Sequence, residues 1–493
     1  MNRPIQTTTG RFGFTDLPNE LLLDTFLRLD LKSLLAVCQS NQQMRSFCQD
    51  DFLWKQKFIQ DFGSAPNLQV GEKWKDIYKT VFLMRPNSPI SSGRNHYGVI
   101  DEKGLLYMAG SNIQSQLGFI SNQKEFTTPV LVQVGPVGTK IISISCSFRS
   151  TIVVTDDGQV YGTGWIDLNL DGKRVDVRTF QKMNVSEKVR KVSHDYKHYI
   201  FLLRNGSVRM NGLFKIDTGS VYINIHVSSL IDIKAIDISV IDGVVYREVD
   251  MMDTTYHSTR YAIIDVNRNL YYWGNGFGVM EPDLNEEEEQ DMIDNDSKML
   301  MKVHYQGLIF KGNTANQITI QPIHIPIPEP VKQIALGSDH ILILSSLGNV
   351  YVIGENHEGQ LGIGDKKKAQ LKTTEIPYKL TLPEKISSVV ANKYTSAAIS
   401  ENGQVYIWGY NNEIISDLKK QRNILRRISY RKNDYFGGIN IMKPIRINLD
   451  IQGYSHLDDT SMDKYEVVYL SLGPVFGIAV TKDGYLDVFG ENG

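Results

Sequence analysis

The sequence predicts a small all-α unit followed by an all-β propeller of seven blades. Leucine-rich stretches with helical spacing fill residues 14–62, and one short hairpin pattern recurs seven times within residues 91–493. Repeated four-stranded units favour a closed ring, because closure leaves only short sheet edges exposed. A linking helix and a linker are expected over residues 63–90.

The overall composition is that of an ordinary soluble protein and excludes few classes of protein. The chain has 493 residues, 41% of them hydrophobic and 22% charged, and a formal net charge of −2. These values are ordinary for a soluble globular protein and give no general attraction to nucleic acid. Residues 1–13 are polar, and we expect a disordered tail there. No stretch approaches the roughly 18 apolar residues of a membrane span, so we expect no membrane contact.

The cysteines and the known site motifs point away from redox or metal chemistry. Cys38, Cys48 and Cys146 are too few for a disulfide framework and lack zinc-binding spacing. We expect three free, buried thiols and a reducing compartment, the cytoplasm or the nucleus. No nucleophile elbow, phosphate loop or zinc-protease motif is present. We therefore expect no cofactor, no metal and no enzymatic activity.

The helix expected over residues 18–29 has a wide apolar surface. Pro18 suits the first helical position, where its missing N–H costs nothing. The apolar side chains spread over about 240° of the circumference, whereas a surface helix needs a stripe of about 100°. They are Leu21, Leu22, Leu23, Phe26, Leu27 and Leu29. Either the rest of the chain or another protein must cover the surplus.

Several of these residues stand in a familiar order. Leu17-Pro18-Asn19-Glu20-Leu21-Leu22, then residues 26–34, and finally Leu53-Trp54-Lys55 resemble the F-box. The resemblance implies a helical unit that docks onto a Skp1-like adaptor, with a cullin and a RING protein beyond it. The residues that it implies for docking are Leu17, Pro18, Leu21, Leu22, Phe26, Leu29, Leu34 and Trp54. The alternative is a helical cap whose leucines only form its own core.

The hairpin pattern combines a strand, a turn residue, an aliphatic residue two places on and a closing glycine. Glycine supplies the positive φ that tight hairpin turns need. The closing glycines are Gly110, Gly164, Gly212, Gly274, Gly354, Gly409 and Gly490. A further motif, such as Pro129-Val-Leu-Val132, lies between several hairpins, so each repeat supplies about four strands.

Two repeats carry a more specific tail. Gln116-Leu117-Gly118 follows Gly110, and Gln360-Leu361-Gly362 follows Gly354 at the same spacing. These tails resemble the RCC1 (regulator of chromosome condensation) family, which implies a seven-bladed propeller. The third and fourth repeats depart from the pattern at Arg209 and Arg268. For the seventh blade, either a strand from near residues 80–95 completes it or the sequence is truncated.

His96, His198 and His340 occupy one repeat position. A repeat position distributes residues around a ring, so these histidines cannot meet at one metal ion. We expect them to make structural hydrogen bonds.

Two insertions, near residues 281–300 and 413–435, carry most of the local charge. Residues 281–296 hold nine acidic and no basic residues, whereas Lys419–Lys432 holds seven basic and no acidic ones. Both follow the closing strand of a repeat, so both should leave the same face of the propeller. Solvated loops are the simple interpretation. The sharper hypothesis is that the basic loop binds an acidic partner or nucleic acid and the acidic loop competes.

Together these features predict a substrate-recognition adaptor of a Skp1–cullin–F-box type ubiquitin ligase. The F-box would dock the Skp1-like protein, and the propeller would bind an unknown protein substrate. The alternatives are a guanine-nucleotide exchange factor for a small GTPase, which the RCC1 resemblance suggests, and a scaffold or chromatin-binding propeller. The combination, rich in Ile, Asn and Lys, also resembles F-box/RCC1 proteins of large DNA viruses of amoebae, whose ligase would be the host's.

Overall fold

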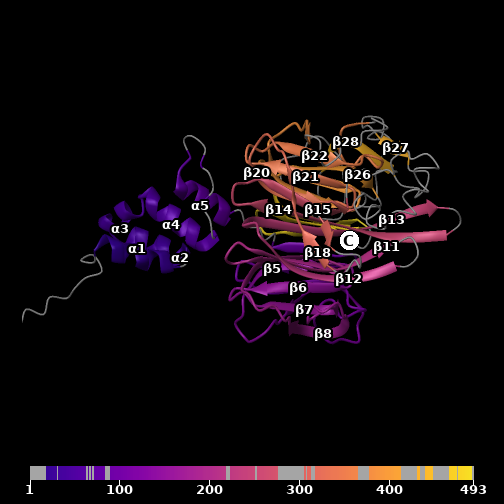
Figure 1. Cartoon of the computed structure of the whole chain (residues 1–493), viewed down its shortest axis with the longest axis horizontal. Helices are drawn as coiled ribbons and strands as arrows, with labels where there is room; N and C mark the ends of the chain where they lie inside the picture. Colours follow the sequence, from indigo (N-terminus) through magenta and orange to yellow (C-terminus); the bar gives the residue numbers. More distant parts are fainter. Residues whose placement is uncertain are drawn as a thin grey trace, which may run out of the picture. The chain divides into compact units, whose positions relative to one another are not determined.

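The computed structural model divides the chain into two compact units, Met1–Arg85 and Pro86–Gly493. The first is helical and the second is built of strands (Figure 1). The structure describes residues 18–29, 31–62, 65, 68, 72–83, 89–217, 222–249, 252–275, 305–306, 308–311, 317–364, 377–411, 430–432, 439–447, 466–474 and 476–490. The expected disordered tail and most of the linker lie outside these residues.

The helical unit contains α1 (Asn19–Arg28), α2 (Leu31–Ser40), α3 (Gln42–Phe47), α4 (Asp51–Phe62) and α5 (Trp74–Leu83). Polar side chains set two of the helix starts. The Asn41 side chain accepts a hydrogen bond from Met44 N at 2.9 Å, and the Asp50 carboxylate accepts one from Phe52 N at 2.9 Å. Both bonds satisfy first-turn amides that lack a partner in their helix. None of the described helices is long and apolar enough to cross a bilayer.

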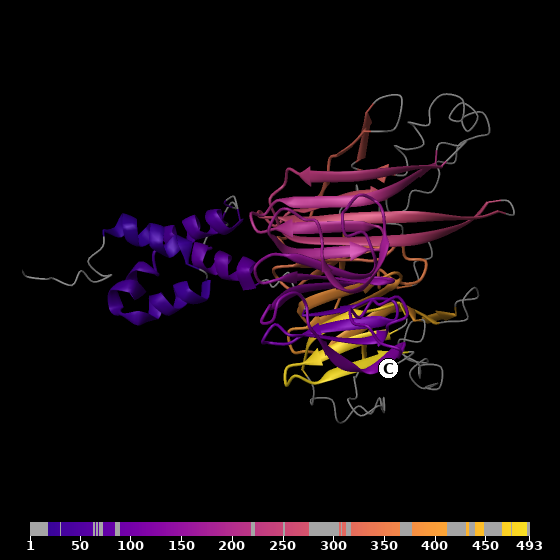
Figure 2. The same cartoon turned by 90° about the horizontal axis from the view of Figure 1, so that it is seen from below.

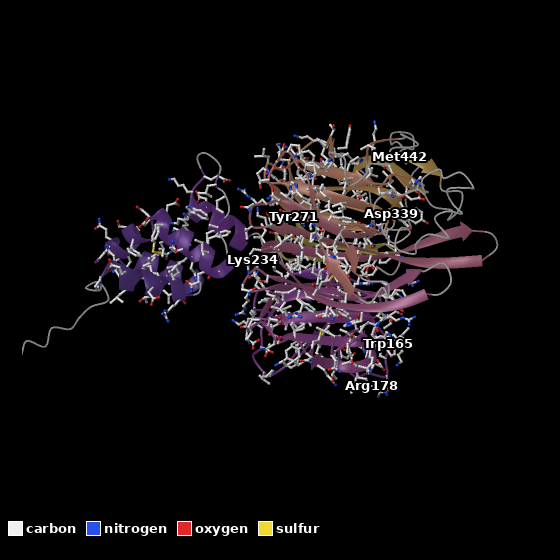
Figure 3. The ribbon with its side chains drawn as sticks, in the orientation of Figure 1. Trp165, Arg178, Lys234, Tyr271, Asp339 and Met442 are labelled. Carbon is white, nitrogen blue, oxygen red and sulfur yellow. A yellow bond between two sulfur atoms is a disulfide. The ribbon has the colours of Figure 1, made fainter. Side chains whose placement is uncertain are left out.

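A disulfide joins Cys38, near the end of α2, to Cys48, directly after α3 (Figure 3). The expectation of three free thiols is therefore wrong for this pair, whereas Cys146 is free and buried. The chain reverses between α2 and α3 and brings the two Cα atoms to 5.7 Å, a proximity that no spacing motif signals. Closing a loop of this size stabilises the folded unit by about 2–3 kcal/mol.

The strands form seven antiparallel sheets that follow one another along the described chain, and each sheet is one blade (Figure 1). Blades one to three are β1 (Ile90–Ser92), β2 (His96–Ile100), β3 (Leu106–Ser111) and β4 (Glu125–Val132); β5 (Ile141–Cys146), β6 (Ser150–Thr155), β7 (Val160–Ile166) and β8 (Val175–Lys182); β9 (Val189–Asp195), β10 (His198–Leu203), β11 (Val208–Asp217) and β12 (Tyr222–Ile231).

Blades four to seven continue the order. They are β13 (Ala235–Val249), β14 (Met252–Asp265), β15 (Leu270–Asn275), β16 (Tyr305–Gln306) and β19 (Ile323–Ile325); β20 (Val331–Leu336), β21 (His340–Ser345), β22 (Val350–Gly354) and β23 (Tyr378–Leu380); β24 (Ile386–Asn392), β25 (Thr395–Ser400), β26 (Val405–Asn411), β27 (Tyr430–Lys432) and β28 (Ile439–Ile447); β29 (Val467–Leu472), β30 (Phe476–Thr481) and β31 (Leu486–Gly490). A separate hairpin pairs β17 (Leu308–Lys311) with β18 (Gln317–Ile320).

Each closing glycine lies in a third strand, directly opposite a residue of the second strand. Gly354 has φ +118°, and a Cβ there would lie 2.2 Å from the carbonyl oxygen of Asp339. The next residue, Glu355, donates its N–H to that same oxygen at 2.8 Å. Only glycine allows this approach. The same direct pairing with the second strand recurs at Gly110, Gly164, Gly212, Gly274, Gly409 and Gly490.

Apolar clusters fill the interfaces between neighbouring blades. One cluster joins Met108 of blade one to Ile144 and Val153 of blade two, and a similar one joins Leu342 of blade five to Trp408 of blade six. Because both faces of each sheet pack against a neighbour, several second strands, such as β6, β21 and β25, are buried at every residue. This explains why these strands read as apolar runs without alternation.

The ring closes differently from the sequence expectation. The strand from the segment 80–95, β1, pairs with β2 in blade one, while residues 74–83 form helix α5. The prediction that such a strand completes blade seven is therefore wrong. Blades one and seven instead meet through an apolar cluster that includes Ile90 and Ile478, and Ser92 N donates to Ser471 Oγ at 3.0 Å. Figure 2 shows blade seven, in yellow, in the same layer as the purple strands of the first blades.

Substituting a closing glycine tests the role of the close approach. Gly354→Ala should lower the free energy of unfolding by on the order of 3 kcal/mol, because a methyl group would collide with backbone at a positive φ. Gly484→Ala is the matched control. Gly484 also has a positive φ, +86°, but nothing lies within 4 Å of its added Cβ. It should cost only about 1 kcal/mol. Equal losses in chemical unfolding would contradict the steric explanation.

Candidate functional site

Half of the residues expected to dock a partner lie inside the helical unit. Leu22, Phe26, Leu34 and Trp54 are at most 1% exposed, and Trp54 Nε1 donates to Cys48 O at 2.8 Å. A side chain without accessible surface cannot contact another protein. Assigning these four to a docking surface was therefore wrong, because they form the core that holds the helices together.

The remaining positions do reach the surface of α1. Pro18 is exposed, Leu21 is 54% exposed and Leu29 is half-buried. Pro18 and Leu21 are three residues apart, so they lie on the same flank of the helix. Leu17 lies outside the described residues. Sequence reasoning missed Phe52, which is the second residue of α4 and is 53% exposed. Among described residues of this unit, Leu21 and Phe52 are the exposed large apolar side chains.

The repeated histidines form hydrogen bonds, as expected, and these bonds link neighbouring blades. His96 Nε2 of blade one lies 2.9 Å from Thr151 Oγ1 of blade two, and that hydroxyl donates to Gln116 O of blade one at 2.8 Å. Because the hydroxyl donates its proton to glutamine, it accepts from the imidazole, which fixes the Nε2–H tautomer. The expectation of structural hydrogen bonds is confirmed. The glutamine of the repeated Gln-Leu-Gly tail supplies the carbonyl group that completes this hydrogen-bond arrangement.

The same arrangement recurs four blades further on, between blades five and six. His340 Nε2 lies 2.7 Å from Ser396 Oγ, which donates to Gln360 O at 2.8 Å. His198 also bonds the next blade, with its Nδ1 2.6 Å from Tyr261 Oη. Burial lowers the pKa of His96 to about 4 and that of His340 to about 3. Both rings are therefore neutral at physiological pH.

A cluster of basic and aromatic side chains comes from turns between first and second strands and, for Arg174, from the loop between β7 and β8. The guanidinium carbons of Arg94 and Arg149 lie 4.6 Å and 4.9 Å from the centre of the Phe148 ring. That of Arg174 lies 4.0 Å from the centre of the Tyr196 ring. Lys197 lies 5.5 Å from Tyr196. We call these six residues the basic–aromatic cluster. Stacked guanidinium groups hold a fixed orientation that suits carboxylate or phosphate groups. Sequence reasoning missed the cluster because its residues come from separate turns.

Blade five presents the opposite charge on the same face. Burial raises the pKa of Tyr394, and the carboxylates of Asp339, Glu358 and Glu355 raise it further. Arg260 Nη2 pairs with Asp339 Oδ1 at 3.2 Å, and Figure 3 labels Asp339. The carboxylates of Asp339, Glu355 and Glu358 come from blade five, so this face carries acidic side chains as well as the basic–aromatic cluster.

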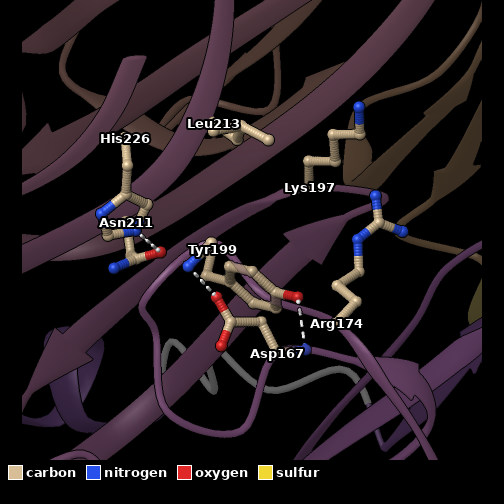
Figure 4. Close-up of a pocket in the computed structure, with 8 residues that line it drawn as sticks. Asp167, Arg174, Lys197, Tyr199, Asn211, Leu213 and His226 are labelled. Carbon is tan, nitrogen blue, oxygen red and sulfur yellow. Dashed lines mark hydrogen bonds between the residues drawn. The ribbon is translucent and has the colours of Figure 1, made fainter. Parts of the chain in front are cut away.

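A small pocket lies beside the basic–aromatic cluster, whose Arg174 and Lys197 are among the residues that line it (Figure 4). Asp167 is its one carboxylate, and it accepts hydrogen bonds from Asp171 N at 3.3 Å and Gly172 N at 2.6 Å. The Tyr199 hydroxyl is 3.3 Å from Asp167 N. These groups hold the loop between β7 and β8. No cluster of metal-ligating side chains occurs in the described part of the chain.

The charged insertions lie almost wholly outside the described residues, which include only Tyr430–Lys432 of the basic one. The strands that lead into them are described. β15 ends at Asn275 and β26 at Asn411, one and two residues after the closing glycine. Their flanking strands therefore reach the same face as the basic–aromatic cluster. Partner binding by Lys419–Lys432 stays a prediction.

Comparison with known families decides what the two units are. Residues 14–60 match the F-box-like family. Residues 141–169, 331–360, 348–399 and 386–413 match the regulator of chromosome condensation (RCC1) repeat. The chain is an F-box-like domain joined to RCC1 repeats. This combination supports a protein-interaction adaptor.

Individual relatives share only part of the RCC1 region. The chain is 40% identical over 97 residues to the human X-linked retinitis pigmentosa GTPase regulator, covering 20% of this chain and 9% of that protein. It is 31% identical over 157 residues to protein pim1 of Schizosaccharomyces pombe, covering 32% of this chain and 26% of that protein. The chain thus spans about a quarter or less of these relatives.

Solved structures match over most of the chain. Yeast RCC1 (Prp20), in a crystal structure with Kap60, aligns with a TM-score of 0.52 and 16% identity over 82% of this chain and 80% of that one. Human WBSCR16 aligns with a TM-score of 0.52 and 16% identity over 80% of this chain and 87% of that one. The RCC1 region is a seven-bladed propeller.

The neutral histidines predict an acid-sensitive RCC1 propeller. In the unfolded chain they titrate near 6.5, whereas the folded pKa of His340 is about 3. Between these values the unfolded state binds more protons, so stability is present at pH 7 and falls as pH drops. His340 should account for about 2–3 kcal/mol of the loss between pH 7 and 4.5. In urea unfolding, His340→Gln should lose less stability over this interval. An unchanged pH dependence would contradict this.

Proposed function

We propose that this protein is the substrate-recognition adaptor of a Skp1–cullin–F-box type ubiquitin ligase. The observation that carries the proposal is the F-box-like domain at residues 14–60, joined to a propeller whose described part holds no metal cluster. The F-box-like domain would dock the Skp1-like protein, which brings a cullin and a RING protein. The propeller would bind the protein substrate.

In this mechanism the chain performs no bond chemistry and needs no cofactor. Holding the substrate beside a ubiquitin-loaded enzyme makes the encounter effectively intramolecular. The local concentration of substrate lysines then rises, to the millimolar range for short flexible connections. The RCC1 blades supply the rigid surface that this requires.

The docking surface of the F-box-like domain would include Leu17, Pro18 and Leu21, with Phe52 as a further candidate. Leu21 and Phe52 expose about half of their area. Burying such a side chain contributes about 1.5–3 kcal/mol before the costs of association. Leu22, Phe26, Leu34 and Trp54 support this surface from inside.

The substrate would contact the face of the propeller that carries both basic and acidic side chains. Acidic groups suit the basic–aromatic cluster, and basic groups suit the carboxylates around Tyr394. Complementary charge mainly accelerates and orients association. Lys419–Lys432 would add a second basic element for an acidic partner or nucleic acid.

The alternative functions make different demands. An exchange factor would accelerate nucleotide release from a small GTPase, and likeness of fold to yeast RCC1 alone does not supply that activity. A scaffold or chromatin-binding propeller would leave substrate levels unchanged when the gene is removed. The adaptor role implies the cytoplasm or the nucleus, where the Cys38–Cys48 bond would meet reducing conditions.

The docking role can be tested on the surface of α1. Pro18→Ala combined with Leu21→Asp should reduce recovery of a Skp1-like protein in co-purification at least tenfold, because a buried apolar contact becomes an unpaired charge. Leu230→Asp is the matched control, since Leu230 is 52% exposed in blade three. It should leave recovery unchanged. Undiminished recovery with the α1 variant, at unchanged thermal stability, would refute the docking surface.

A further inference from the structure

The two rings of the basic–aromatic cluster are neighbours. The centres of the Phe148 and Tyr196 rings lie 6.3 Å apart, and the ring planes meet at 81°. The cations around these rings come from blades one, two and three, and they are Arg94, Arg149, Arg174 and Lys197. The cluster is therefore one continuous array that gathers four positive charges from three adjacent blades.

None of these four cations has a partner of opposite charge within the described part of the chain. They form no salt bridge there, and their side chains donate no hydrogen bond to a described group. Two cations elsewhere in the propeller do have carboxylate partners, since Lys191 lies 2.5 Å from Asp237 and Arg260 lies 3.2 Å from Asp339. Repulsion among like charges opposes folding. A bound anion would relieve that repulsion in the cluster.

The backbone at the second ring of the cluster has an unusual conformation. Tyr196 has a φ of +33°, in the left-handed region that bulky residues seldom adopt. This turn holds the ring against Arg174, which is half-buried. Backbone strain of this kind concentrates at binding sites, where the surrounding structure maintains it. The orientation of Arg174 is therefore set before a ligand arrives.

The pocket in Figure 4 adds a buried donor beside two of the cations. Arg174 and Lys197 line it together with Tyr199, which is 2% exposed. The Tyr199 hydroxyl accepts from Asp167 N at 3.3 Å but donates its own proton to no described group. Burial raises the pKa of Tyr199 to about 12, and the positive charge of nearby Arg174 opposes this rise. The Asp167 carboxylate accepts from amides of its own loop, so it pairs with neither cation.

The number of donors and charges indicates which anion fits. Arg174 and Lys197 supply two positive charges, and the Tyr199 hydroxyl supplies a third donor group. A phosphate monoester carries nearly two negative charges at pH 7 and has three acceptor oxygens. A carboxylate carries one charge, and so does each phosphodiester of a nucleic acid. The pocket therefore favours a phosphate monoester over both.

Apolar side chains beside the cluster favour a protein as the carrier of the phosphate. Trp165 is 38% exposed, and its N–H donates to Arg149 O at 2.9 Å, so the two residues are adjacent. Val175, which directly follows Arg174, is 49% exposed. Tryptophan and arginine are the residue types that contribute most at protein interfaces. A free phosphate ion would leave both apolar side chains uncovered.

We propose that the basic–aromatic cluster binds a phosphorylated serine or threonine in an extended segment of a partner protein. Arg174, Lys197 and the Tyr199 hydroxyl would hold the phosphate. Acidic residues or a second phosphate a few positions away would reach Arg94 and Arg149, and apolar residues of the segment would pack against the exposed tryptophan. This inference deepens the proposed function by naming the class of substrate, and it rests on that proposal only for calling the partner a substrate.

Retention of the full chain on immobilised peptides tests the phosphate preference. The probes are two mixtures of short peptides with random flanking residues and either phosphoserine or serine at the centre. The phosphoserine mixture should retain the chain at least tenfold more strongly. Arg174→Gln combined with Lys197→Gln should remove this preference without lowering thermal stability, because neither side chain has a salt bridge to lose. Lys173→Gln combined with Arg178→Gln is the matched control. It removes two exposed charges nearby and should keep the preference.

The accessible tryptophan reports where the peptides bind. Trp165 is 38% exposed, whereas the other four tryptophans are at most 8% exposed. Quenching of tryptophan fluorescence by acrylamide, a neutral molecule, should therefore fall when the phosphoserine mixture is added. The fall should be absent in Trp165→Phe and in the double variant at Arg174 and Lys197.

Three results would overturn the proposal. They are equal retention by the two mixtures, a phosphoserine preference that survives Arg174→Gln with Lys197→Gln, and single-stranded RNA that binds these residues more tightly than the phosphoserine mixture does. The adaptor role is measured separately, by recovery of a Skp1-like protein. A chain that recovers this protein but shows no phosphoserine preference would refute the phosphate site alone. A chain with the preference but without such recovery would refute the adaptor role alone.

Discussion

The close approach of closing glycines to the second strand governs the architecture of the propeller, and six of the seven closing glycines have a positive φ. At Gly354 the carbonyl of Asp339 accepts a hydrogen bond from Glu355 N, and it lies so close that a Cβ on Gly354 would collide with it. This contact fixes the register of the hairpin. The loops that follow the third strands and the turns that precede the second strands are thereby brought to one face. Both charged surfaces of the propeller lie on that face.

A second recurring contact joins neighbouring blades. In it, a buried histidine, a hydroxyl group and a glutamine carbonyl are linked by hydrogen bonds across the interface. The His96 imidazole bonds the Thr151 hydroxyl of the next blade, and that hydroxyl donates a hydrogen bond to Gln116 O of the first blade. The ring donates through its Nε2–H, and burial keeps it neutral by lowering its pKa. The stability of the ring is therefore a sum over interfaces between adjacent blades, as in other repeat proteins.

The hairpins, the number of blades and the structural use of His96 and His340 could be predicted from the sequence, because repetition reveals equivalent positions. Three features could not. Burial of Phe26 and Trp54 depends on how short helices pack, and a motif does not separate its core from its surface. The Cys38–Cys48 bond depends on a chain reversal between helices. The basic–aromatic cluster depends on turns that are distant in sequence and meet only in the ring.

The loop between third and fourth strands has one more property. In blade one, β4 starts at Glu125, soon after β3 ends at Ser111, whereas in blade four the sequence runs from Asn275 to Ile323. The pairing is nevertheless the same, with Val132 opposite Leu106 and Ile325 opposite Leu270. Lengthening a loop adds little to its closure entropy. The connection between third and fourth strands can therefore change in length and sequence during evolution, and new sequences can be grafted into it, while the pairing of the strands is retained.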